Sequence, residues 1–360
     1  MTATRAALLS LLFPFALSSL PASAQTSFRQ AAEAAPALEF FLPQPVLTPV
    51  RQDRLSREAA LEKRRLFDYR KSAVLSVKSD RPKVHRDYSE QTFRLRIQDP
   101  LGEKGEYVQE YFYYRTAEPG PRPTVVVFRP FGGGKTIDAM TAIKYAKRGY
   151  NAIISVPTES LADQTRPIAK IGSLLIRECI AGRVAIDLLE TLPGTDKERI
   201  YATGISMGGI RTSLFFGVEP RVKKASEIVG GGDLPGIIAD TEFTTLKKVR
   251  DARMRIEGIR TIEEFRSYMR KVTPVDPLDF GVLREPEDLL MFIGKGDQFV
   301  LDKYQEKLFH AFSRPEEGRY PLALHTEKGH ILTAAKIEEH VIASIEFFET
   351  GVISANRDGR

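Results

Sequence analysis

The stretch YATGISMGGI, residues 201–210, decides the fold. An apolar run leads into Gly204, and the residues after Gly208 are suited to a helix, so the stretch predicts a sharp turn between a strand and a helix. A turn this tight strains the backbone of the serine at its centre and leaves room only for glycine beside it. We therefore expect the hydroxyl of Ser206 to project from the end of a sheet, where a base could activate it as a nucleophile. The alternative is a plain glycine-rich turn.

Short apolar runs around this turn predict a sheet that is mostly parallel. They follow Pro123 at residues 124–128, 150–156, 199–205, 225–231, 288–294 and 320–326. Most are separated by stretches with helical periodicity. Strands buried on both faces, alternating with helices, are typical of βαβ units. We expect an α/β fold whose central sheet is flanked by helices.

Residues 232–285 interrupt this alternation. The segment is too long for a simple crossover and predicts two or three amphipathic helices, with Ile259, Ile262, Phe265 and Met269 on one apolar stripe. We expect an insertion that forms a lid over one end of the sheet. The alternative is an ordinary helix with a long loop.

The first 24 residues predict a cleaved secretory signal peptide. Arg5 precedes an apolar stretch that ends in ASA at residues 22–24, where signal peptidase needs small side chains. The stretch is too short to cross a membrane, and Pro14 and Pro21 interrupt it, which disfavours an uncleaved anchor. We expect the mature protein to be secreted or periplasmic, without stable insertion in a membrane.

Residues 25–90 are expected to form an N-terminal extension before the main domain at 91–350. The extension begins with an Ala- and Pro-rich leader, and the periodicity at 54–74 predicts a surface helix. Residues 92–98 and 107–116 alternate in polarity around a turn, which predicts a hairpin.

Composition narrows the class of protein. The net charge is +6, but basic and acidic residues are interspersed, which indicates solubility rather than binding to nucleic acid. Cys179 is the single cysteine and lies in a run typical of a buried helix, so we expect a core residue and no internal disulfide.

A nucleophilic serine needs a base and an acid. His330 falls between the last apolar run and the final helix, so we expect it in a loop at the edge of the sheet that carries Ser206. The other histidines lie before the sheet, within helices or inside a strand: His85, His310, His325 and His340.

Asp297 directly follows the run at 288–294 and is the preferred acid. Asp233, one strand earlier, is its rival. We expect Asp302 to cap or begin the next helix, and Glu327 lies too near His330 in the chain to be the first choice.

The order Ser206, Asp297, His330 resembles the nucleophile, acid and base of the α/β-hydrolase superfamily. The resemblance covers about Thr92 to Phe348 and implies an α/β-hydrolase fold with a lid at residues 232–285. Within the superfamily the chain is most similar to exported esterases of the dienelactone-hydrolase and acetyl-xylan-esterase kind. It has Ser206 where dienelactone hydrolases proper have cysteine, and Ile205 where histidine is common.

A second glycine-rich stretch, RPFGGGKT at residues 129–136, can be interpreted as a phosphate-binding loop, an oxyanion hole or a merely structural turn. Its Gly-Lys-Thr ending suggests a phosphate-binding loop, but Arg129 occupies the position of the first required glycine. The resemblance instead implies an oxyanion hole, with N–H groups from Phe131 and Gly132 and a further one from Met207. Lys135 and Thr136 are then expected to begin the next helix.

These features predict an exported serine hydrolase that cleaves carboxylic esters through an acyl-enzyme and needs neither metal nor organic cofactor. A peptidase or acyltransferase of the same fold, or a binding protein that keeps the fold without catalysis, remains an alternative. The expected partner is a small or polymer-borne ester. No motif indicates the natural substrate or the oligomeric state.

Overall fold

The computed structural model describes residues 54–131 and 137–354. The predicted signal peptide and the Ala- and Pro-rich leader lie outside the described residues, as do Gly132, Lys135 and Thr136.

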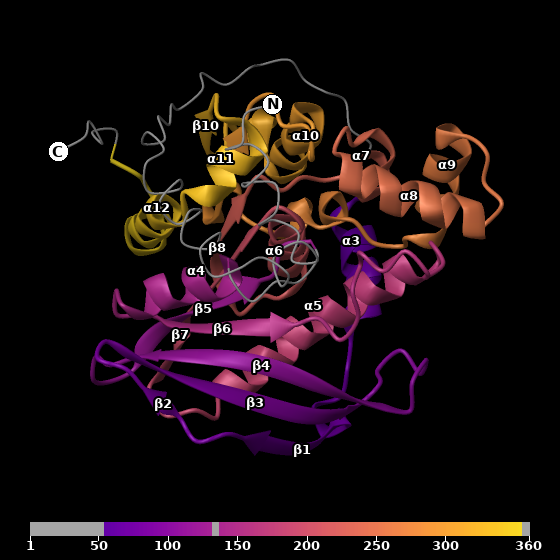
Figure 1. The fold of residues 1–360 in the computed structure, drawn as a ribbon. Helices are drawn as coiled ribbons and strands as arrows, with labels where there is room; N and C mark the ends of the chain where they lie inside the picture. The colour runs from indigo at the N-terminus through magenta and orange to yellow at the C-terminus, as the bar shows by residue number, and fades with distance from the viewer. Residues whose placement is uncertain (1–53, 132–136, 355–360) are drawn as a thin grey trace, which may run out of the picture.

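The strands form one sheet in the order β1-β3-β4-β6-β5-β7-β8-β9-β10, with β2 paired to β3 at its side (Figure 1). Strands β5 to β10 run parallel, while β1 to β4 join them through antiparallel pairs. The predicted parallel sheet is confirmed. Its strands are β1 (Val74–Ser79), β2 (Lys83–Val84), β3 (Tyr88–Gln98), β4 (Glu106–Thr116), β5 (Arg122–Phe128), β6 (Asn151–Val156), β7 (Thr195–Ile205), β8 (Val222–Ile228), β9 (Leu289–Gly294) and β10 (Leu322–Thr326).

The hairpin predicted before the sheet is also present. Strands β3 and β4 pair in register from Tyr88 opposite Thr116 to Gln98 opposite Glu106. The surface helix before it is shorter than predicted: α3 spans Arg57–Arg64. Two 3-10 turns follow it, and β1 then begins at Val74, because the chain has to extend there to pair with β3.

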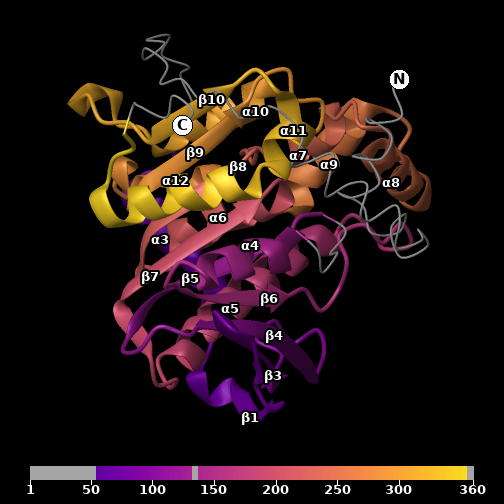
Figure 2. The same ribbon diagram turned by 60° about the vertical axis from the view of Figure 1, so that its left-hand side comes forward.

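Helices cover both faces of the sheet. The main ones are α4 (Ile137–Ala146), α5 (Lys170–Leu189), α6 (Met207–Val218), α10 (Asp302–Phe312), α11 (Gly329–Ala335) and α12 (Ile337–Thr350). On one face, Tyr201 of β7 stacks on Phe348 of α12 with ring centroids 4.3 Å apart. Phe128 pairs in register with Gly204, three residues further along β7, so its side chain points to the opposite face. There it packs against Phe215 of α6. Figure 2 shows α4 and α12 together in front of the sheet.

Three helices occupy the segment between β8 and β9, as the sequence predicted. They are α7 (Leu234–Asp240), α8 (Thr244–Ile256) and α9 (Ile262–Val272), and they project together on one side of the molecule (Figure 1). A capping box between Thr261 and Glu264 begins α9. Phe265 and Met269 of its apolar stripe are fully buried, which fixes this helix to the rest of the fold.

Cys179 is buried in α5, and burial raises the pKa of its thiol well above the usual range. The interpretation as a core residue is confirmed. Within residues 54–131 and 137–354, the helices are all too short or too polar to cross a membrane.

Candidate active site

Ser206 lies at the junction between β7 and α6. Ile205 is the last residue of the strand and Met207 the first of the helix. The backbone of Ser206 has φ 61° and ψ −123°, a strained conformation for a residue with a side chain. Its N–H donates to the carbonyl oxygen of Ile228 at 2.8 Å, which ties the turn to β8. The predicted sharp turn from strand to helix is therefore present.

Glycine is required on both sides of this serine. A Cβ on Gly204 would lie 2.4 Å from the carbonyl oxygen of Gly208, and one on Gly208 would lie 2.4 Å from the carbonyl oxygen of Phe128. Both contacts are with backbone, which cannot move aside as a side chain can. The strand, the turn and the helix can approach this closely only because these positions have no side chain.

His330 is the second residue of α11, which corrects the expectation that it lies in a loop. Gly329 adopts φ 64°, so the chain turns sharply after β10 and begins a short helix at once. The imidazole of His330 is buried in this position. Its Nε2 lies 2.9 Å from Oγ of Ser206.

Asp297 follows β9 and contacts the other side of the imidazole. Its Oδ2 lies 2.6 Å from Nδ1 of His330, and both side chains are buried. Its Oδ1 accepts hydrogen bonds from the backbone N–H groups of Phe299 at 2.7 Å and Val300 at 3.0 Å. Because a carboxylate only accepts, Nδ1 donates to it, which leaves Nε2 free to take the proton of Ser206.

Asp302 begins α10, as expected, and stabilises the turn that carries the acid. Its carboxylate accepts the N–H groups of Gly296 at 3.2 Å and Asp297 at 3.3 Å. Gln305, one turn further along α10, donates from Nε2 to Oδ2 of Asp297 at 3.3 Å. Backbone and side-chain donors thus hold the carboxylate of Asp297 in place independently of its contact with His330.

The rival acid has other partners. Asp233 caps the N-terminus of α7 through a 3.2 Å bond from the N–H of Gly236, and its second oxygen lies 2.6 Å from Nζ of Lys307. Glu327 pairs with Lys295 at 3.3 Å. The structure therefore brings Ser206, His330 and Asp297 together, and engages Asp233 in capping.

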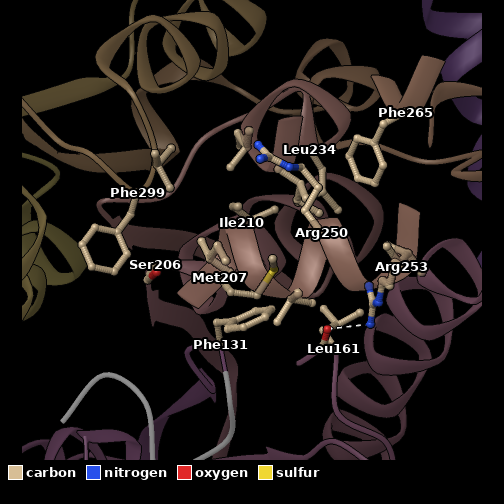
Figure 3. A pocket seen from close by; sticks show the side chains of 16 residues that line it. Phe131, Leu161, Ser206, Met207, Ile210, Leu234, Arg250, Arg253, Phe265 and Phe299 are labelled. Atoms are coloured by element: carbon tan, nitrogen blue, oxygen red, sulfur yellow. Dashed lines mark hydrogen bonds between the residues drawn. The ribbon is translucent and has the colours of Figure 1, made fainter. Parts of the chain in front are cut away.

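An apolar cavity of about 40 Å³ opens beside Ser206 (Figure 3). Phe131 and Met207, two of the expected oxyanion donors, line it. Met207 is the first residue of α6, so its N–H belongs to the helix end, where no intrahelical acceptor is available. Gly132, the third expected donor, lies outside the described residues. Helices α7, α8 and α9 supply much of the remaining wall, including Leu234, Ile237, Ile238, Leu246, Val249, Arg250, Arg253 and Phe265.

Contacts with α4 and α6 hold the segment before Phe131 in place. The buried guanidinium of Arg129 forms an ion pair with Asp138, and the carbonyl oxygen of Arg129 accepts a 2.7 Å bond from Arg211. Arg211 in turn donates to Glu178 at 3.1 Å. Arg129, where a phosphate-binding loop needs glycine, thus has a structural role in holding this segment against α4 and α6.

Two residues of the site were not anticipated from the sequence. The ring of Phe299 stacks on His330, and Glu227 lies fully buried near the end of β8. Burial raises the pKa of Glu227 to about 8, and the nearby charge of Asp297 adds to the rise. A charged residue inside the apolar run ASEIVGG was the signal for Glu227. For Phe299, the signal in the sequence was its position: it is an aromatic residue only two positions after the candidate acid Asp297.

Within residues 54–131 and 137–354, no cluster of three or more His, Cys, Asp or Glu side chains is placed to hold a metal ion.

The sequence matches no protein-family model and no curated protein. Solved structures with a similar fold include an acetyl xylan esterase from Paenibacillus sp., with a TM-score of 0.58, 14% identity, and coverage of 92% of this chain and 99% of that one. Acetyl xylan esterase 1 from Thermoanaerobacterium sp. has a TM-score of 0.57 and 13% identity, with 79% and 95% covered. A glucuronoyl esterase from Teredinibacter turnerae has a TM-score of 0.52 and 14% identity, and the match covers 79% of this chain and 83% of that one. The chain has the α/β-hydrolase fold.

Proposed function

We propose that the protein is a serine hydrolase that cleaves carboxylic esters through an acyl-enzyme. The observation that carries the proposal is the hydrogen-bonded chain from Ser206 Oγ to His330 Nε2 at 2.9 Å and from His330 Nδ1 to Asp297 Oδ2 at 2.6 Å. A nucleophile, a base and an orienting carboxylate in this order are what acyl transfer requires. Esterases among the similar solved structures support the choice of esters.

In the proposed mechanism each residue has one task. Ser206 attacks the ester carbonyl while His330 takes its proton at Nε2 and then returns it to the leaving alkoxide. Asp297 holds the imidazole in the tautomer that can accept this proton and stabilises the imidazolium that forms. A water molecule, activated by the same imidazole, then releases the acyl group from Ser206.

The oxyanion of the tetrahedral intermediate needs donors on the side of Ser206 that faces the cavity. We propose the N–H of Met207, at the start of α6, with a second from Phe131 or Gly132. The loss of one such donor costs about 3 kcal/mol of transition-state stabilisation in other enzymes. We also propose that α7, α8 and α9 act as the lid over this cavity, because their side chains line it together with Ser206.

Active-site labelling tests the proposal. A fluorophosphonate probe should modify the wild-type protein, and mass spectrometry should locate the adduct on Ser206. The variant Ser206→Ala should lose labelling and ester turnover while keeping the wild-type circular dichroism spectrum, because it removes one oxygen at a partly exposed turn. Residual turnover within about tenfold of wild type would remove Ser206 from the mechanism.

A substrate panel separates the remaining alternatives. p-Nitrophenyl esters of increasing acyl length and acetylated xylan should be hydrolysed, whereas p-nitroanilide peptides should not. Transfer of the acyl group to an added alcohol in preference to water would identify an acyltransferase. A binding protein without catalysis would be labelled by no probe and would cleave no ester.

We propose that the enzyme is exported. The basis is the charge at Arg5, the apolar stretch after it and the ASA sequence at residues 22–24. N-terminal sequencing of the protein expressed at full length should give a mature chain that begins after Ala24. A product that keeps its first residues and stays with the cytoplasm would contradict export.

A further inference from the structure

Two arginines of α8 line the cavity that contains Ser206, although most of the other lining side chains are apolar. Figure 3 shows Ser206 at one side of the cavity and Arg253 at the opposite side, with Met207 and Phe131 between them. Arg250 lies one helical turn before Arg253. A substrate that fills the cavity from Ser206 therefore meets Arg253 at its far end.

Arg253 is buried, with 3% of its surface exposed, and its hydrogen bonds are incomplete. Its Nη2 donates to the carbonyl oxygens of Leu161 at 2.7 Å and Asp163 at 3.1 Å. Its Nε is buried without a hydrogen-bond partner. Within the described parts of the chain, Arg253 forms no ion pair, and the carboxylate of Asp163 is directed to Thr165 and Arg166.

This arrangement costs stability in the unliganded protein. A buried guanidinium normally has a carboxylate partner, because neutral carbonyl groups replace only part of the hydration that the charge loses. Burial lowers the pKa of Arg253 to about 10, so the group is still charged at neutral pH. The nearby carboxylate of Asp163 opposes this decrease but is itself paired with Arg166. A buried cation that has no direct ion pair, at the far end of a cavity that contains Ser206, indicates an anionic ligand.

Arg250 differs from Arg253 because its guanidinium has a carboxylate partner. Its Nε lies 2.9 Å from Oδ1 of Asp251, and its Nη1 donates to the carbonyl oxygen of Ala239 at 2.6 Å. Its charge is therefore already compensated by a neighbouring carboxylate. Arg253 is the arginine of α8 that has both the buried charge and the unused donor.

We propose that the cavity binds esters whose enclosed part has a short apolar body ending in a carboxylate, and that Arg253 anchors this carboxylate. The inference rests on the proposed function, since it specifies the substrate of the same site. A guanidinium donates charge-assisted hydrogen bonds to a carboxylate, and Nε is the donor of Arg253 that has no partner in the protein. The anchor takes no part in bond making: hydrolysis breaks the ester C–O bond, consumes one water and leaves the second carboxylate unchanged.

The size of the cavity limits the length of the apolar body. About 40 Å³ accommodates roughly three water molecules, hence a group of only a few non-hydrogen atoms. A carboxylate two or three carbons from the scissile carbonyl fits this limit. Longer bodies would require α8 to move away from the site.

Matched pairs of esters test the anchor. Monoethyl succinate is compared with ethyl 4-methylpentanoate, in which an isopropyl group replaces the carboxylate. 3-Acetoxypropanoate is compared with 3-methylbutyl acetate in the same way. The first pair places the anion in the acyl part of the ester, and the second pair places it in the alcohol part. The pair in which the anionic ester has the higher kcat/KM therefore identifies which part enters the cavity.

We expect the wild-type enzyme to prefer the anionic member of one pair by roughly 10- to 100-fold in kcat/KM, as for a charge-assisted hydrogen bond. Arg253→Gln should remove this preference, so that the ratio of kcat/KM between the anionic and the neutral ester falls to about one. The control Arg255→Gln makes the same charge change at an exposed position of α8 and should keep the preference.

Two outcomes would overturn the anchor. If Arg253 merely ties α8 to the carbonyl groups of Leu161 and Asp163, Arg253→Gln will lower turnover of both esters equally. If circular dichroism shows that Arg253→Gln does not fold, the test rests on the wild-type enzyme. A higher kcat/KM for the neutral ester than for the anionic ester in both pairs would then reject the proposal. A wild-type protein that cleaves none of the esters and takes no fluorophosphonate would instead reject the proposed function.

Discussion

The ring of Phe299 lies parallel to the imidazole of His330, with the ring centroids 4.3 Å apart and 8° between the planes. The backbone N–H of the same residue donates to Oδ1 of Asp297 at 2.7 Å. Phe299 therefore contacts the base with its side chain and the acid with its backbone. The ring of Phe299 also stacks on Phe243, which directly precedes α8, with the ring centroids 3.8 Å apart, and this contact links α8 to the site.

Phe299→Leu should lower kcat by roughly 10- to 100-fold. The substitution keeps the N–H bond to Asp297 but removes the flat surface that holds the imidazole, and a small displacement of a catalytic group has effects of this size. Phe243→Leu is the matched control, because the stacking partner of Phe243 is Phe299 and that of Phe299 is His330. Steady-state kinetics on p-nitrophenyl acetate would show the difference. An unchanged kcat in Phe299→Leu, or an equal loss in both variants, would show that the stacking does not position the base.

Asp297→Asn should lower kcat by about four orders of magnitude. The amide can still accept the N–H groups of Phe299 and Val300, but its NH₂ group cannot accept from Nδ1, so His330 adopts the wrong tautomer. Asp233→Asn is the comparison, because asparagine keeps the cap of α7 and loses the ion pair with Lys307. Its kcat should stay within a few-fold of wild type. Single-turnover kinetics of both variants would check the ranking, and the reverse ranking would reject the assignment of the acid.

The strands could be predicted because their signal is local. An apolar run such as TVVVF or DLLMFIG reports burial on both faces directly, and the structure has strands β5 and β9 there. The turn at Ser206 could be predicted too, because the pattern of Gly204, Ser206 and Gly208 is local, although the close contact that requires Gly208 is with Phe128 of β5. The candidate site was found because chain order limits which residues can meet at one edge of a parallel sheet.

What was missed depends on contacts between distant residues. The stacking of Phe299 on His330 joins the loop after β9 to helix α11, and no periodicity indicates it. The helix that carries His330 depends on the left-handed conformation of Gly329, which a sequence allows but does not require. The anchoring of Arg129 by Asp138 and Arg211 likewise appears only when α4 and α6 are in place.

The oxyanion interpretation of residues 131–136 predicts a contrast between backbone and side chain. Gly132→Pro should lower kcat sharply with little change in KM, because it deletes an N–H that matters most in the transition state. Lys135→Ala should leave kcat nearly unchanged, since its side chain has no chemical role. Steady-state kinetics of both variants, after circular dichroism has shown that they are folded, would check this. A melting temperature that rises with Mg-ATP in wild type and not in Lys135→Ala would instead establish a nucleotide loop.

Glu227 should make the protein less stable as the pH rises. Its side chain is completely buried, Oε2 accepts the N–H of Gly230 at 2.7 Å, and Oε1 has no hydrogen-bond partner. A Cβ on Gly209 would lie 2.9 Å from Oε2, and a Cβ on Gly230 would lie 2.4 Å from Oε2 and 2.9 Å from the backbone carbonyl carbon of Gly209, so the space around the carboxyl group is closely filled. This carboxyl group is therefore enclosed in a space that fits it and offers little solvation for a negative charge.

The sign of this pH dependence follows from the number of protons that the folded and unfolded states bind. Burial raises the pKa of Glu227 to about 8 in the folded protein, whereas the unfolded chain releases the same proton near the ordinary value of about 4.3. Between these values the folded state binds more protons than the unfolded state, so the free energy of unfolding falls as the pH rises. The stabilisation is complete below the lower pKa and is lost as the pH rises through the upper one.

Glu227→Gln isolates this effect, because glutamine keeps the size and the acceptor for Gly230 but cannot ionise. From pH 5 to pH 8 the free energy of unfolding of wild type should fall relative to the variant by on the order of a few kcal/mol. Urea unfolding at several pH values measures it, with Glu198→Gln as a control at an exposed glutamate. If wild type and Glu227→Gln keep a constant difference across this range, Glu227 is ionised in the folded protein and the enclosure around it must provide a donor for its charge.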